Sequence, residues 1–176
     1  MNEPSIDVLI PQEELENRLD ELAAEIDNRH RETEALTCIG VLKGSLYFLA
    51  DLTRRLKTPI EIDFVQVSSY RGTVRGRLEV KRRPQLDLKE RTVLLVEDIV
   101  DSGYSVATVL DILAEHGAEN VEVCTLLDKK PAREVEVPVT YSGFEVGDAF
   151  VVGYGLDLDE RLRNLPYIGL VKQEEA

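Results

Sequence analysis

Three carboxylates and a turn of small residues follow an apolar run near the middle of the chain. The stretch 93–106 reads VLLVEDIVDSGYSV, and its carboxylates belong to Glu97, Asp98 and Asp101. Adjacent carboxylates accept hydrogen bonds from the two hydroxyls of a sugar such as ribose. The turn that follows suits a phosphate group, because glycine lets the backbone approach a ligand and helix-start amides favour an anion. The stretch therefore predicts a site for a phosphorylated sugar, with helix capping by the acids as the structural alternative.

Apolar strands and amphipathic helices alternate around this stretch. We expect strands at 35–42, 60–70, 91–98, 121–128, 149–154 and 167–171, and helices at 11–30, 46–57 and about 104–116. Alternation of this kind predicts an α/β fold with a mainly parallel sheet. In open α/β sheets ligands bind outside the carboxyl ends of the strands, which is where the acidic stretch lies.

Composition indicates one soluble domain. The chain has 176 residues, of which 43% are hydrophobic and 31% charged, and its net charge of −13 argues against a nucleic-acid surface. No apolar run approaches the roughly 18 residues of a membrane span, and residues 1–18 lack the features of a signal peptide. Cys38 and Cys124 lie in apolar runs without a CxxC partner, so we expect buried free thiols. We expect a cytoplasmic protein that binds neither nucleic acid nor membrane.

The segment VEDIVDSG (96–103) resembles the ribose-phosphate signature of the phosphoribosyltransferases, in the form of their hypoxanthine-guanine branch. The resemblance implies that Glu97 and Asp98 hold the ribose hydroxyls and that Asp101 is the catalytic acid/base facing the purine N7. It also implies that four residues wrap the 5-phosphate: Ser102, Gly103, Tyr104 and Ser105. The family often has threonine at the last of these positions and varies at the third.

Two further segments resemble family motifs in the expected order. VLKGS (41–45) is similar to the diphosphate-binding loop, in which the peptide before the lysine is often cis; the matching residues are Leu42, Lys43 and Gly44. SSY (68–70), with Ser69 and Tyr70, is similar to the start of the flexible catalytic loop, which we expect at about 68–84. Read without the resemblance, the first segment ends a strand and the second begins a mobile basic loop or an exposed hairpin.

The last two motifs concern the base and the diphosphate. LLDKKPAR (126–133) resembles the segment whose first lysine, here Lys129, reaches the purine 6-oxo group. FVVGYGLDLDERLRNLPYIG (150–169) is the closest match. It implies stacking of Phe150 on the base, a backbone hydrogen bond from Val151, and diphosphate contact by Arg163. Asp157 is implied to lie near the purine 2-position and a Mg²⁺ ion, to which Glu97 and Asp98 are further candidate ligands.

The resemblance spans about residues 35–171 and implies a type I phosphoribosyltransferase fold. That fold is a mainly parallel twisted sheet flanked by helices, with a small hood subdomain and the flexible catalytic loop, and we expect one domain over 1–176. The implied reaction is purine salvage, in which phosphoribosyl diphosphate and hypoxanthine or guanine give IMP or GMP and diphosphate. The resemblance also implies Mg²⁺ and a homodimer or homotetramer. The motifs do not distinguish among hypoxanthine, guanine and xanthine.

Three other interpretations compete with a purine salvage enzyme. An RNA-binding regulator of pyrimidine operons shares the fold, but the net charge and Lys129 disfavour it. A phosphoacceptor signalling domain needs its acidic pair after the first strand, whereas Glu97 and Asp98 lie past mid-chain. A non-catalytic relative would not need Asp101. His30 and His116 match no catalytic position, and we interpret both as surface or helix-end residues.

Overall fold

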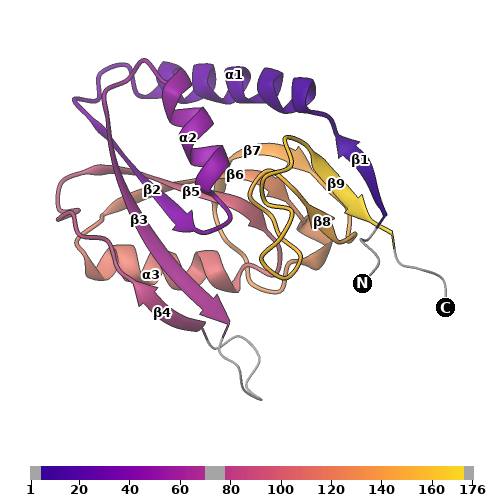
Figure 1. Ribbon diagram of the computed structural model, residues 1–176. Coiled ribbons are helices and arrows are strands. Elements are labelled where there is room, and N and C mark those ends of the chain that lie inside the picture. Colours follow the sequence, from indigo (N-terminus) through magenta and orange to yellow (C-terminus); the bar gives the residue numbers. More distant parts are fainter. Residues whose placement is uncertain (1–4, 70–77, 173–176) are drawn as a thin grey trace.

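The computed structural model describes residues 5–69 and 78–172, which form two sheets (Figure 1). The larger sheet has the strand order β4-β3-β2-β5-β6-β7. Its strands are β2 (Leu36–Leu42), β3 (Ile60–Ser69), β4 (Leu78–Arg82), β5 (Thr92–Val100), β6 (Asn120–Asp128) and β7 (Val139–Glu145). Neighbouring strands are parallel except for the antiparallel pair β3 and β4. The expected α/β class with a mainly parallel sheet is confirmed.

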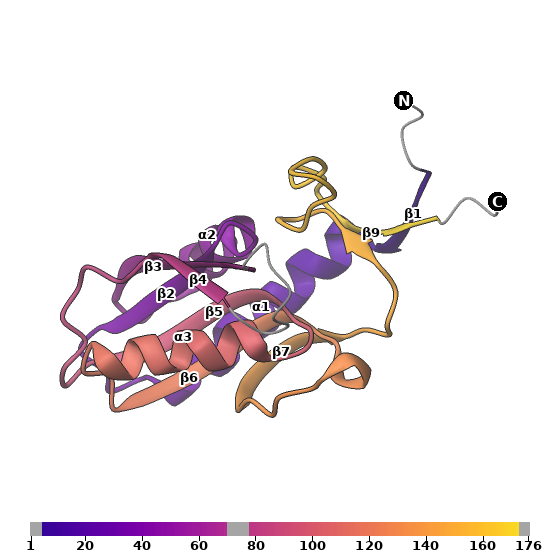
Figure 2. The same cartoon turned by 90° about the horizontal axis from the view of Figure 1, so that it is seen from below.

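Helices cover both faces of this sheet (Figures 1 and 2). On one face α1 (Gln12–Arg29) and α2 (Leu46–Arg55) bury a core cluster that includes Leu19, Phe48 and Leu94. On the other face α3 (Tyr104–Glu115) buries a second cluster that includes Val109 and Leu95. Because successive side chains of β5 point to opposite faces, one apolar strand supplies both clusters.

The smaller sheet is the hood, formed by β1 (Ile6–Ile10), β8 (Val151–Val152) and β9 (Ile168–Val171) in the antiparallel order β1-β9-β8. The hood lies beside the carboxyl ends of β2, β5 and β6 (Figure 1). The expected small hood subdomain is therefore present.

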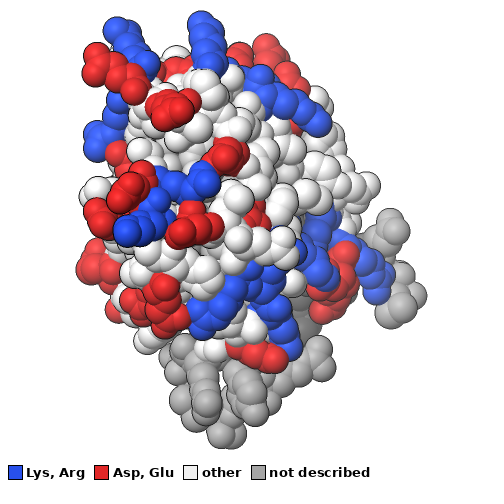
Figure 3. Space-filling model, turned by 90° about the vertical axis from the view of Figure 1, so that its left-hand side faces the viewer, with Lys and Arg blue, Asp and Glu red and all other residues white. Residues whose placement is uncertain are grey.

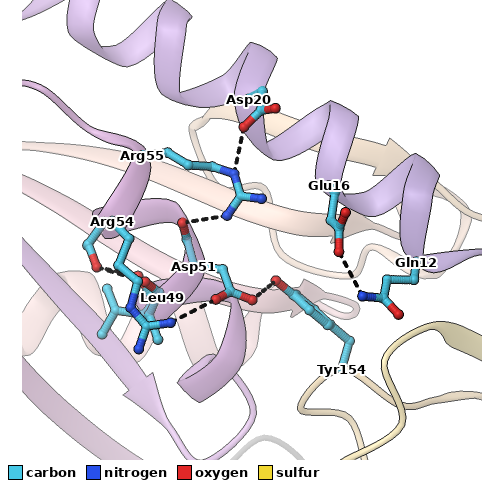
Figure 4. Close-up of polar contacts among 10 residues, drawn as sticks. Gln12, Glu16, Asp20, Leu49, Asp51, Arg54, Arg55 and Tyr154 are labelled. Atoms are coloured by element: carbon cyan, nitrogen blue, oxygen red, sulfur yellow. Dashed lines mark hydrogen bonds and ion pairs between the residues drawn. The ribbon is translucent and has the colours of Figure 1, made fainter.

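The hood is tied to α2 by a polar network shown in Figure 4. The Tyr154 hydroxyl donates a hydrogen bond of 2.7 Å to Asp51, which also pairs with Arg54. Arg55 donates to Asp20 of α1 at 2.7 Å. Helices α1 and α2 thus hold the segment that follows β8 in place.

Several expected elements differ in extent from the structure. Strand β5 continues beyond the expected 91–98 to Val100, so Glu97 and Asp98 lie within the strand rather than at its last two positions. The expected strand 149–154 shortens to two residues, and β1 and β7 were not predicted. The flanks of the expected catalytic loop pair as an antiparallel hairpin through Ser69 and Leu78, while residues 70–77, including Tyr70, lie outside the described residues.

Buried polar and thiol groups mostly follow expectation. Cys38 and Cys124 are fully buried free thiols, as predicted. His30 does end α1, but it is buried rather than on the surface, because its ring packs against β6 and bonds to Glu122 at 3.0 Å. On the face shown in Figure 3, acidic and basic side chains are mixed over the upper part, whereas basic side chains adjoin one another in the lower part.

Candidate active site

The acidic pair Glu97 and Asp98 lies near the carboxyl end of β5, where both side chains are buried. Burial, and then the charge of Asp98, raises the pKa of Glu97 well above its usual value. Burial also raises the pKa of Asp98 to about 6, against backbone hydrogen bonds and the charge of Arg163 that lower it. One carboxylate oxygen of Glu97 has no hydrogen-bond partner among the described residues. Such a pair can offer both a donor and acceptors to the hydroxyls of a sugar.

We use the name 101–105 turn for the connection from β5 to α3 together with the first two residues of that helix, and this segment borders a cavity of about 160 Å³. Residues of the turn line it together with Glu97, Ile99, Val100 and Val106. Gly103, the N-cap of α3, has a φ of 92°, and no side chain caps the helix. The amides at the start of α3 are therefore free of capping side chains, and their dipoles favour an anion in the cavity.

A cluster of cations and acids lies on the other side of the acidic pair. The Leu42–Lys43 peptide is cis, and the Lys43 ammonium lies 3.0 Å from Glu160. Arg163 pairs with the same Glu160 at 3.0 Å and with Asp157 at 2.9 Å. Hydrogen bonds from Lys43 and then from Arg163 lower the pKa of Glu160. We call these four side chains the ion-pair cluster.

Gly44 packs directly against the acidic pair. A Cβ atom at Gly44 would overlap the Asp98 carboxylate, and one at Gly155 would overlap the Gly44 carbonyl. The loop after β2, the end of β5 and the segment after β8 therefore meet at one point, with Leu42 leading into it. Only glycine fits at positions 44 and 155 with this spacing.

Lys129, directly after β6, is the third element of the site. Its side chain is only 9% exposed, and its ammonium lies 3.5 Å from Asp101 and 3.4 Å from Asp148. Phe150 exposes 53% of its surface, whereas Val151 is buried in β8. A flat ligand resting on Phe150 would therefore contact the hood, with a donor-only cation and a carboxylate nearby.

Most of the predicted site residues lie at this one edge of the sheet. Ser102, Gly103 and Ser105 line the cavity, and Tyr104 begins α3 beside it. The sequence interpretation missed Asp148 and Glu160. Glu160 could have been found from its i,i+3 spacing to Arg163, whereas Asp148 stands in a loop without periodicity. The roles given to these residues are predictions.

The fold and the site together define a phosphoribosyltransferase. The sequence matches the phosphoribosyl transferase domain over residues 9–159, and the chain belongs to that family. It is 44% identical to hypoxanthine phosphoribosyltransferase of Haemophilus influenzae, over 99% of this chain and 100% of that protein. It is also 44% identical to hypoxanthine-guanine phosphoribosyltransferase of Bacillus subtilis, over 94% of this chain and 92% of that protein.

Solved structures agree with these relatives. A hypoxanthine-guanine phosphoribosyltransferase from Bacillus anthracis, with HEPES in its active site, superposes with a TM-score of 0.90 at 38% identity, over 97% of this chain and 100% of that chain. A Trypanosoma cruzi hypoxanthine phosphoribosyltransferase in complex with IMP superposes with a TM-score of 0.89 at 31% identity, over 98% of this chain and 97% of that chain.

Within residues 5–69 and 78–172, no helix has the length and apolar composition that crossing a bilayer requires.

Proposed function

We propose that the protein transfers the 5-phosphoribosyl group of phosphoribosyl diphosphate to hypoxanthine or guanine, giving IMP or GMP and diphosphate. The observation that carries the proposal is the 3.5 Å approach of Lys129 to Asp101, together with the 3.4 Å approach of Lys129 to Asp148, two residues before Phe150. A lysine donates hydrogen bonds but does not accept them, so it selects a purine with an acceptor at position 6. A carboxylate beside it can take the N7 proton as the base attacks.

The proposed reaction separates charge between the sugar and the leaving group. Breaking the bond at C1′ leaves positive charge on the ribose, which the acidic pair faces, and negative charge on the diphosphate. Lys43 and Arg163 offer donors to that diphosphate, and the amides of the 101–105 turn hold the 5-phosphate. Val151 bonds the base edge, and the backbone near Asp157 meets the purine 2-position. Ser69 and Tyr70 begin the loop proposed to close over the site.

The acids present fit a Mg²⁺ ion shared with the substrate. Among the described residues no group of three or more metal-binding side chains gathers. Mg²⁺ needs no such group, because it is commonly held by one or two carboxylates and substrate phosphates. Asp157, and the unpartnered Glu97 oxygen with Asp98, would hold it. When bound, the ion neutralises charge on the diphosphate.

We also propose a single domain over residues 1–176, a homodimer or homotetramer, and a cytoplasmic location without nucleic-acid or membrane binding. The family match over residues 9–159 supports the first of these. The net charge of −13 supports the absence of a nucleic-acid surface.

The test of the function is steady-state kcat/KM with phosphoribosyl diphosphate and each of hypoxanthine, guanine, xanthine and adenine. We expect turnover of hypoxanthine or guanine and at least about tenfold discrimination against adenine, because its 6-amino group leaves the buried ammonium without an acceptor. Excess EDTA should abolish turnover. Comparable rates with adenine would show that Lys129 does not read the base, and full turnover in EDTA would remove the metal from the proposal.

A further inference from the structure

The 101–105 turn is held from behind by residues 129–135, which follow β6. Backbone N–H groups of this segment donate to the carbonyl oxygen of Val100 at 3.0 Å and twice to that of Ser102 at 2.9 Å. A Cβ atom at Gly103 would overlap a carbonyl oxygen of the same segment. The turn and the segment are therefore packed backbone against backbone.

This packing fixes the direction of the turn's amide groups. In a planar trans peptide, the C=O of one residue and the N–H of the next point in opposite directions. Carbonyls of residues 100–102 that face the segment therefore send the N–H groups of residues 101–103 to the opposite side. The cavity of about 160 Å³, proposed above for the 5-phosphate, is lined by these same residues.

The side chain that completes this arrangement is Arg133, which is only 9% exposed. Its Nε donates to the Asp101 carbonyl oxygen at 3.0 Å, and its Nη2 donates to the Val100 carbonyl oxygen at 3.3 Å. The same Nη2 pairs with Asp128, the last residue of β6, whose side chain is almost fully buried. Because the guanidinium is rigid and planar, the pairing of Nη2 with Asp128 fixes the whole group to the sheet, and Nη2 and Nε then hold two successive carbonyls, those of Val100 and Asp101.

We propose that Arg133 is a positioning residue for the 5-phosphate site. It touches no substrate atom, and it acts through the peptide units of residues 100–102, which it holds so that their amides face the phosphate. The proposal rests on the proposed function for the identity of the ligand. Lysine at this position would keep the charge beside Asp128 but not the paired donors, since an ammonium is a point charge.

The test compares two ligands that use different parts of the site. Arg133→Lys should weaken binding of ribose 5-phosphate, which needs the 101–105 turn, by at least about tenfold, the loss expected for misaligned donors to a phosphate. Binding of diphosphate with Mg²⁺, which uses the ion-pair cluster, should stay within about twofold of the parent. Calorimetric titration measures both affinities without turnover. The result is thus independent of which base the enzyme uses.

Arg18→Lys is the matched control. Arg18 also donates to two successive carbonyl oxygens, those of Ser142 at 2.8 Å and Gly143 at 3.0 Å, but these lie in β7. A purely structural arginine should change the melting temperature and leave both affinities unchanged. The Arg18 variant is expected to behave in that way.

Equal losses of ribose 5-phosphate and diphosphate affinity in Arg133→Lys would overturn the proposal, as would unchanged ribose 5-phosphate affinity. If that variant does not fold, Asp128→Asn tests the same arrangement from the other partner. It keeps the carbonyl bonds but loosens the guanidinium, so ribose 5-phosphate affinity should fall about threefold with diphosphate affinity unchanged. Unchanged affinity for both ligands in Asp128→Asn would also refute the positioning role. Absence of transfer activity in the parent, by contrast, would contradict only the proposed function.

Discussion

The 101–105 turn and the ion-pair cluster both face anionic parts of the proposed substrate, but they are built differently. The turn offers backbone amides whose carbonyls are already bonded on the far side, and its supporting Arg133 is 9% exposed. The cluster offers Lys43 and Arg163, which share Glu160, a side chain that is 63% exposed. Preorganised donors bind with little reorganisation, whereas exposed ion pairs are weak and exchange readily. One anion site is thus fixed before binding, and the other is formed by exchange of partners.

The largest expected effect comes from the Asp101 side chain, which lies on the 101–105 turn but is not one of the groups that hold the turn in place. Asp101→Asn should lower kcat by about 10²–10⁴-fold, because asparagine keeps the shape but takes no proton. Affinity for phosphoribosyl diphosphate should stay nearly unchanged, since the backbone holds the turn. Stopped-flow turnover and titration from pH 6 to 9 measure the two quantities. The loss should shrink at high pH, where the free purine ionises; an unchanged kcat throughout would remove the acid/base role.

The buried acidic pair beside the turn should lower the free energy of unfolding near neutral pH. The folded-state pKa of Asp98, about 6, lies above its usual value of 3.8, so folding is favoured at low pH and disfavoured as pH rises through 6. Two pH units correspond to about 3 kcal/mol. Asp98→Asn should therefore raise the free energy of unfolding by about 1–3 kcal/mol at pH 7.5, with little change at pH 4. Urea denaturation of both proteins at the two pH values measures this, and a gain independent of pH would contradict it.

The rigidity of the turn predicts that a substitution at Gly103 weakens phosphate binding, by less than the loss of kcat expected for Asp101→Asn. Gly103→Ala places a Cβ atom against a backbone carbonyl at a left-handed φ of 92°, so the turn must shift. Ribose 5-phosphate affinity should fall at least about tenfold, since the amides move away from the phosphate. Gly147→Ala is the control, because a Cβ atom there meets nothing within 4 Å. Equal affinities for the two variants would mean that the turn adapts to its ligand.

A substitution in the ion-pair cluster should have the smallest effect, and it should strengthen ligand binding rather than weaken it. Glu160→Gln removes the anion shared by Lys43 and Arg163, so diphosphate affinity should rise about two- to fivefold. Glu115→Gln, which removes an exposed pair with Arg83, should leave it unchanged. Titrations at low and high salt measure the gain, which should shrink as salt screens the cluster. Weaker diphosphate binding by Glu160→Gln would mean that Glu160 orients the cations rather than competing for them.

Local pattern was enough to predict much of the fold. The spacing of Leu15 and Leu22 marked the buried face of α1, and the apolar run before Glu97 marked β5. Strand β1 was missed because its middle residues are exposed and β9, with which it pairs, is more than 150 residues away in the sequence. Strand β7 was missed because its apolar and polar residues alternate only weakly and because it contains Gly143.

The site was predicted through motifs, and its supports were not. Each motif occupies a few consecutive residues, so resemblance placed Lys43 and Asp101 without knowledge of their neighbours. Arg133 supports the turn through backbone carbonyls, which carry no sequence signal. Asp148 approaches Lys129 from a separate loop, and such a contact exists only once the hood is in place. Tertiary packing, not local pattern, decides these positions.

The pairing of β1 with β9 has a consequence for how the protein is made. Ile10 pairs with Ile168, so the hood joins the first and the last of the described strands. On the ribosome, β1 therefore stays unpaired while the larger sheet assembles, since β9 is synthesised after every strand of that sheet. Pairing between segments so far apart is also slow in refolding, because the entropy of closing the chain must be overcome first. The hood, which we propose to contact the purine, is thus completed after β5, so a partly synthesised chain contains the proposed acid/base Asp101 before this base-binding wall has formed.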